Sequence, residues 1–222
     1  MLRKHLVVAL AALAGSAAAQ AQVGVTADLG TTGAGFHLVV PMEKTLNGRF
    51  GVNYYKHDFD RRSGGVNYDA DARLQTYDVL FDWYAFDGSP FRLTGGVLYN
   101  ASSASANARP DADGNYRING RGYRAADVGA LEARVDFQKA APYFGIGWGN
   151  ALSQNKRWSF SGDLGAFYHG KAHVSLRETC SGGAITCIVL RSDVQAEAAR
   201  LREQLSDHKF FPVLRASVSY RF

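Results

Sequence analysis

The end of the chain alternates strictly between apolar and polar residues, and this pattern restricts the fold more than any other feature. The two sets are Leu214, Ala216, Val218, Tyr220 and Phe222 on one side and Arg215, Ser217, Ser219 and Arg221 on the other. Because successive side chains of a β-strand point to opposite faces, this segment is predicted to be a strand with one apolar face. A bilayer can cover that face while the arginines point into a barrel lumen.

Four earlier segments repeat the alternation. Their apolar positions are Phe50, Val52 and Tyr54; Tyr77, Val79, Phe81 and Trp83; Phe91, Leu93, Val97 and Tyr99; and Trp158, Phe160, Leu164 and Tyr168. The intervening positions collect charges of both signs. Soluble barrels of the lipocalin type have an apolar inward face, which this chain lacks. After the N-terminal segment no apolar run reaches the ~18 residues that a spanning helix needs, so any membrane span must consist of strands.

The connections between these segments alternate in length. Short turns are predicted at 43–47, 87–90 and 153–157, and long polar connections at 60–72, 101–129 and 177–209. Outer-membrane barrels have short periplasmic turns and long outside loops, so the short turns and Phe222 are assigned to the periplasm. Residues 132–137 either extend a strand above the membrane or belong to a folded outside loop.

The strand count completes the predicted fold. Seven strands are clear, and a barrel with both ends on one side needs an even number. Residues 23–29, joined to 34–42 by the turn Gly30-Thr31-Thr32-Gly33, supply the remaining strand. The fold class is therefore all-β, an eight-stranded antiparallel transmembrane β-barrel with a short helix in the last extracellular loop.

The N-terminal segment predicts export. Arg3 and Lys4 precede an apolar run over 6–13, and Ala19-Gln20-Ala21 reads as a cleavage site. We expect a signal peptide over 1–21 and a barrel domain over 22–222; a lone membrane helix would need a longer run. The net charge is +5, of which Arg3 and Lys4 account for two, so +3 remains. This excess is too small to indicate nucleic-acid binding.

Two features mark the last long connection. In an exported chain Cys180 and Cys187 are expected to form a disulfide, because a metal site would need more ligands. Residues 192–208 place Val194, Ala198 and Leu201 at helical spacing. This helix either packs across the barrel mouth or serves a partner or the lipid headgroups.

The terminal strand also carries a family resemblance. Its last residues, 217–222, end on an aromatic and look like the C-terminal signature of Gram-negative outer-membrane barrels, which is read by the barrel-assembly machinery. On this resemblance the assembly signal is Val218, Tyr220 and Phe222. Together with the signal peptide and the girdle aromatics, the mature chain resembles the small OmpA-like and OmpW-like barrels. Those girdle residues are Trp83, Tyr84, Phe86, Trp148 and Trp158.

The resemblance implies a location and partners, but no activity. Glycine-rich stretches at 30–35, 91–96 and 141–149 also resemble those of proteobacterial outer-membrane proteins. We therefore expect a monomer in the outer membrane of a Gram-negative bacterium, in contact with outer-membrane lipids and, during biogenesis, with the barrel-assembly machinery. Neither nucleic acid nor a cofactor is expected.

The inward charges form the main candidate site. They are Arg49, Asp78, Asp82, Arg92, Asp163, Arg215 and Arg221, with Glu132, Arg134 and Asp136 higher up. The interior of an eight-stranded barrel is only wide enough for side chains to fill, so opposite charges are expected to pair and plug it. A structural or surface-interaction role follows, and a narrow pore for small solutes is the alternative.

Catalytic and metal sites are weaker hypotheses. His173 and Ser175, with Glu178 nearby, resemble the His-x-Ser of barrel lipid A deacylases, but residues 176–179 do not continue that pattern. We therefore expect no enzyme. His37 and His57 are isolated in sequence, and His169 and His173 lie about 13 Å apart along a strand, too far to share a metal. The stretch 111–115 resembles a calcium loop that lacks its twelfth-position glutamate.

Overall fold

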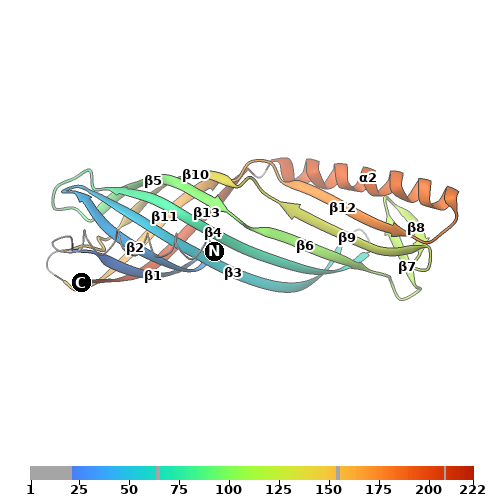
Figure 1. The fold of residues 1–222 in the computed structure, drawn as a ribbon, viewed down its shortest axis with the longest axis horizontal. Coiled ribbons are helices and arrows are strands. Elements are labelled where there is room, and N and C mark those ends of the chain that lie inside the picture. The colour runs from blue at the N-terminus through green and yellow to red at the C-terminus, as the bar shows by residue number, and fades with distance from the viewer. Residues whose placement is uncertain (1–21, 64–65, 154–155, 208) are drawn as a thin grey trace, which may run out of the picture.

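The computed structural model describes residues 22–63, 66–153, 156–207 and 209–222. The signal peptide predicted over 1–21 lies outside these residues. Within them the chain forms a closed barrel that continues at one end into an open sheet covered by a helix (Figure 1).

Eight antiparallel strands close the barrel, which confirms the predicted fold class. Each strand pairs with the next, and the last pairs with the first. Their order around the barrel is β1 (Gly24–Gly30), β2 (Gly33–Glu43), β3 (Leu46–Ser63), β4 (Val66–Trp83), β5 (Phe91–Asn100), β10 (Ala140–Trp148), β11 (Trp158–Tyr168) and β13 (Phe210–Arg221).

The first hairpin completes this ring. β1 pairs with β2 from Gly24↔Val39 to Gly30↔Gly33, and with β13 from Gly24↔Arg221 to Gly30↔Arg215. The hairpin predicted over residues 23–42 is therefore confirmed. Closure leaves no strand edge unpaired within the barrel wall, as a hydrocarbon environment requires.

Burial in the barrel is the reverse of that in a soluble protein. Large apolar side chains face outward, with exposed fractions of 79% for Phe160 and 72% for Phe144, while Arg49 and Asp163 are each only 3% exposed. Rings cluster near one end, where Trp158 lies 4.9 Å from Tyr220. An apolar belt with aromatic rims around a polar interior suits a lipid bilayer. Within the described part of the chain, no helix is long and apolar enough to cross a membrane.

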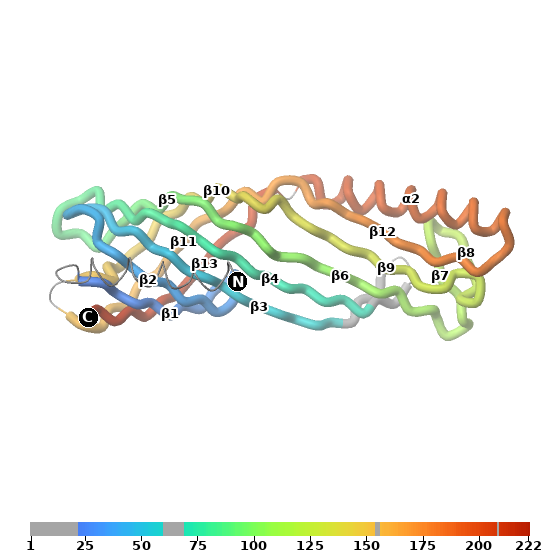
Figure 2. The backbone as a smooth tube through the Cα atoms, viewed as in Figure 1, coloured from blue at the N-terminus to red at the C-terminus, as the bar shows by residue number. Residues whose placement is uncertain are grey.

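Two strands of the barrel continue far beyond it. β3 and β4 pair without interruption from Leu46↔Trp83 to Ser63↔Val66, so the long loop predicted at 60–72 is wrong. The segment carries no apolar alternation because this part of the hairpin leaves the belt, and its outward positions carry charged residues such as Lys56, Asp58 and Asp71 in place of the aromatics. The hairpin forms the first two strands of what we call the extension (Figure 2).

Three more strands complete the extension. β6 (Ser103–Arg109), β9 (Val128–Asp136) and β12 (His173–Cys180) add to β4 in that order. A separate hairpin, β7 (Asn115–Ile118) and β8 (Arg121–Arg124), lies at the far tip. The long polar connection predicted at 101–129 is thus largely sheet. The sequence left open whether 132–137 is a strand above the membrane or part of a folded loop. Residues 132–136 belong to β9, which is a strand of the extension.

The helix begins earlier than predicted and lies elsewhere. It is α2 (Ala184–Ser206) rather than 192–208, and it runs lengthwise along β12 instead of across the barrel mouth (Figure 1). Its Leu190 and Val194 join a buried cluster with Tyr116, Tyr123 and Leu131 of the extension. Helical periodicity missed the first turns because Ile185 and Ile188 there are exposed. The predicted Cys180–Cys187 disulfide is present and ties β12 to α2.

Candidate functional site

A four-residue ion-pair layer crosses the lumen near the turn end of the barrel, the end at which β2, β4 and β10 turn back. Arg49 contacts Asp82 and Asp163, each at 3.1 Å. Arg92 contacts Asp163 at 2.7 Å and Asp82 at 3.4 Å, and it also donates to the carbonyl of Gly149. All four charged side chains are at most 5% exposed. Each guanidinium therefore meets two carboxylates and each carboxylate two guanidiniums.

A second layer surrounds His37. The Nδ1 atom lies 2.7 Å from a carboxylate oxygen of Asp28, and Nε2 lies 3.0 Å from one of Asp78. Arg215 approaches Asp28 at 3.2 Å and Asp78 at 3.7 Å. Asn53 donates to Asp78 at 2.9 Å. His37 is fully buried, so these groups are the hydrogen-bonding partners within reach of its ring nitrogens.

The two layers together balance in charge if His37 is the imidazolium. Ionised carboxylates accept hydrogen bonds and do not donate, so the ring donates to both Asp28 and Asp78 only when both of its nitrogens carry a proton. The lumen then holds four cations, Arg49, Arg92, Arg215 and His37, against four anions, Asp28, Asp78, Asp82 and Asp163. Charges removed from water are tolerated when each is paired in this way.

Glycines on neighbouring strands make room for these large side chains. Gly51 of β3 pairs in register with His37 of β2, and a Cβ at Gly51 would lie 2.1 Å from the imidazole Cδ2. Gly147 of β10 pairs with Arg92 of β5, and a Cβ there would lie 2.7 Å from the guanidinium carbon. The side chains of His37 and Arg92 therefore lie directly over the glycine backbone of the neighbouring strand.

Little space remains in the charged region. The cavity beside Arg49, Asp82 and Arg92 has a volume of about 10 Å³, which is at the lower limit for a single water molecule. Toward the extension the lumen is filled by an apolar group that includes Leu80, Tyr143 and Phe167. Side chains thus obstruct the barrel at two successive levels.

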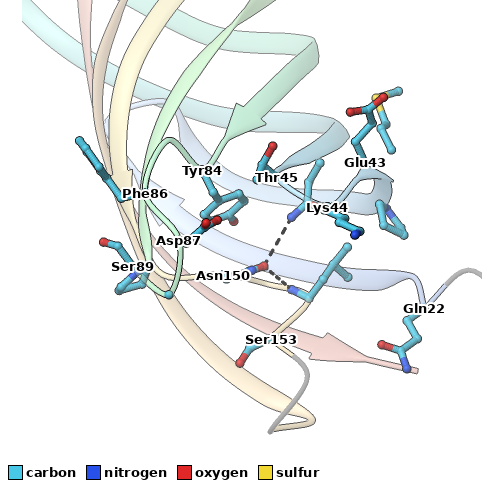
Figure 3. A pocket seen from close by; sticks show the side chains of 16 residues that line it. Gln22, Glu43, Lys44, Thr45, Tyr84, Phe86, Asp87, Ser89, Asn150 and Ser153 are labelled. Carbon is cyan, nitrogen blue, oxygen red and sulfur yellow. Dashed lines mark hydrogen bonds between the residues drawn. The ribbon is translucent and has the colours of Figure 1, made fainter.

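A wide hollow lies below the charged layers. It has a volume of about 790 Å³ and is lined by the turns, among them Lys44, Tyr84, Asp87 and Asn150 (Figure 3). The side-chain oxygen of Asn150 accepts from the backbone amide of Leu152 at 2.9 Å and from the side-chain amide of Asn47 at 3.4 Å. We call this hollow the vestibule. The vestibule is confined to the turn end of the barrel, among the residues that connect β2 to β3, β4 to β5 and β10 to β11.

The structure gathers most of the predicted lumen charges. Six of the seven are buried in the two layers, whereas Arg221 is half-buried near the chain start and donates to Gln22. Glu132, Arg134 and Asp136 lie outside the lumen, on β9 of the extension. The predicted assembly residues lie at the end of the last strand, where the rings of Tyr220 and Phe222 are 5.1 Å apart.

Sequence reasoning missed two members of the network, Asp28 and His37. Asp28 was detectable, since it alternates with Leu29 and Ala27 in a segment already predicted as a strand. His37 appeared isolated because its partners come from β1 and β4, nine and 41 residues away along the chain. Sequence neighbours cannot reveal such cross-lumen pairs.

The catalytic alternative is not assembled. His173 and Ser175 share one face of β12, but Glu178 lies on the other and pairs with Arg191 of α2 at 3.3 Å. The Asp111 carboxylate accepts from the Asp113 and Asn115 amides, which closes a turn. Among the described residues there is no group of three or more His, Cys, Asp or Glu side chains able to hold a metal ion.

Comparison with known proteins identifies the fold. No protein-family model matches the chain, and no curated protein does. CarO of Acinetobacter baumannii is 22% identical, with a TM-score of 0.55 over 90% of this chain and 98% of its own. CarO2 of the same species is 19% identical, with a TM-score of 0.57 over 91% and 100%. Both are eight-stranded outer-membrane barrels, and the likeness is one of fold.

Proposed function

We propose that this chain is a monomeric outer-membrane protein of a Gram-negative bacterium whose lumen is closed and whose extension carries its interactions at the cell surface. The observation that carries this proposal is the pair of charge layers, in which three arginines and His37 meet four aspartates across the barrel. A solute would have to separate these pairs to pass. Each separation would leave a buried charge without a partner, at a cost of several kcal/mol.

The membrane location is supported by the outward belt and by the end of the chain. Exposed rings and aliphatic side chains surround the barrel, and acyl chains would cover them. Val218, Tyr220 and Phe222 would be the residues read by the barrel-assembly machinery. The turn end would face the periplasm and the extension the outside. No catalytic step is part of the proposal, since Glu178 is turned away from His173 and Ser175.

Single-channel recording in planar bilayers tests the closed lumen. The folded state is first established by heat-modifiable gel mobility of the full chain. We expect the native protein to be silent, and the double variant D82N/D163N to remain silent where it folds, because the His37 layer and the apolar group around Tyr143 still fill the lumen. Reproducible conductance steps from the native protein would overturn the proposal.

A narrow pore is the second candidate, and the vestibule favours it. A hollow of about 790 Å³ below Arg92 could receive a small solute before it met the charges. In that case the native protein would show conductance steps that vanish when Arg92 or Asp82 is neutralised. The two functions thus differ in what they predict for the native protein, which is silent if the lumen is closed and conducts if it is a pore.

A further inference from the structure

The outward face of the barrel wall continues directly into the extension. On β3 the outward positions run from Val52 and Tyr54 in the belt to Lys56 beyond it, all exposed. On β4 they run from Tyr77 back to Arg73, which is also exposed. Figure 2 shows both strands passing from barrel to extension without a break. A lipid whose acyl chains contact the belt here would therefore place its headgroup against the outward face of the extension.

The first charges above the belt on these strands are both cations. Lys56 and Arg73 are directly opposite each other in the β3–β4 register. Like charges in that position are unfavourable unless an anion lies near them. Lys56 forms ion pairs with Asp58 at 3.2 Å and with Asp71 at 3.7 Å. Arg73 makes no ion pair with any residue that the structure describes.

Hydrogen-bonding groups follow on the same face. The register carries this face from Arg73 to Ser103 of β6 and on to Asp136 of β9. Its next row holds Asp58, Asp71, Ser105, Arg134 and Ser175, and the row after that includes Asp69, Asn107, Glu132 and Arg177. Five residues, Glu132, Arg134, Asp136, Ser175 and Arg177, line a hollow of about 220 Å³. The surface is rich in donors and acceptors and close to neutral, which suits sugar hydroxyls.

We infer that the outward face of the extension binds a phosphorylated glycolipid of the outer leaflet. Its phosphate lies between Lys56 and Arg73, and its sugars lie along β6, β9 and β12. The phosphate supplies an anionic partner for Arg73, which has none among the described residues, and a second one for Lys56. The continuous strand face places the acyl chains, the phosphate and the sugars in sequence along the molecule. This inference rests on the membrane location in the proposed function, but not on the closed lumen.

The test uses the full folded chain in detergent, titrated with lipid A and followed by native mass spectrometry. The probes are bisphosphorylated and fully dephosphorylated lipid A. We expect a preference of about tenfold or more for the phosphorylated form, since each cation near anionic headgroups contributes roughly fivefold. The variant K56Q/R73Q should lose the preference, and K56R/R73K should keep it.

A matched control removes the same charge elsewhere. R117Q/R124Q alters exposed residues of β7 and β8, at the far tip of the extension, and should leave the preference unchanged. Equal binding of both lipids by the native protein, or a preference that survives K56Q/R73Q, would overturn the inference. Conductance is recorded on the same samples: a protein that conducts but keeps its phosphate preference refutes the closed lumen and leaves this surface standing.

Discussion

Arg49 of β3 and Asp163 of β11 lie 3.1 Å apart although their strands stand on opposite sides of the barrel. Three strands separate them in either direction around the wall. The two side chains therefore span the lumen between them, and the closure of the barrel at this level depends on a contact between side chains. Such a contact is stabilising only while both partners remain.

Removing one carboxylate from this layer should destabilise the whole barrel. D163N leaves Arg49 and Arg92 buried with Asp82 alone, and breaking a buried pair costs about 3–5 kcal/mol. Urea unfolding of the reconstituted protein, read as loss of heat-modifiable mobility, measures the change. The matched control is D136N, whose partner Arg134 is exposed at 56%. An exposed pair contributes at most about 1 kcal/mol, so equal losses in the two variants would contradict this account.

Gly51 should tolerate no side chain. In G51A the new methyl would occupy the place of the His37 ring, and overpacking of this kind costs about 1–3 kcal/mol. G95A is the control, because a Cβ at Gly95 meets nothing within 4 Å. The same urea assay should show a lower midpoint for G51A and a shift within about 0.5 kcal/mol for G95A. A native midpoint for G51A would mean that His37 can move aside.

The barrel was predictable because the bilayer imposes a simple rule on each strand. Lipid contacts one face, so positions such as Phe160 and Leu164 are apolar while Asp163 between them is not. Turn lengths then gave the topology. The same rule made six lumen charges visible one strand at a time, but not which of them pair, because pairing across the lumen depends on closure rather than on sequence neighbours.

The extension was not predictable by that rule. Outside the membrane no lipid enforces apolar alternation, and the inner face there carries small residues on β4 and β6, such as Ala70, Ala72 and Ala104. Segments of this composition read as polar loops. The helix was found only where Val194 and Ala198 are buried, since its first turns expose Ile185 and Ile188. The error at 60–72 therefore comes from the missing apolar alternation, and the short estimate of α2 comes from its exposed first turns.

The contact between α2 and the tip hairpin should weaken in acid. Tyr123 donates to Asp193 at 2.5 Å and Asn119 donates at 2.9 Å, and these hydrogen bonds lower the pKa of the Asp193 carboxyl. A lowered pKa stabilises the folded state above the ordinary aspartate value of about 3.9, and this stabilisation is lost as the pH falls through the folded value. The protection factors of the α2 amides against hydrogen exchange, which are corrected for the intrinsic pH dependence of exchange, should therefore be constant between about pH 5 and 8 and lower below about pH 4.

The variant Y123F tests which group is responsible. It removes the donor to an ionised carboxylate, which costs about 2 kcal/mol locally, so exchange in α2 should rise already at neutral pH. Y116F alters another buried ring of the same cluster and should behave like the native protein. Identical exchange in Y123F and Y116F would assign the stability of this contact to apolar packing alone.

Reduction of the disulfide should loosen the extension without opening the barrel. Cys180 ends β12 and Cys187 lies in the first turn of α2, seven residues later. For so short a loop the chain-entropy relation gives about 2.5 kcal/mol of stabilisation. The double variant C180S/C187S should therefore be cut faster by protease at residues 181–187. Its heat-modifiable mobility and its urea midpoint should match those of the native protein, because the eight barrel strands close through β1 and β13 and do not include β12. A lower urea midpoint would show that barrel and extension unfold as one unit.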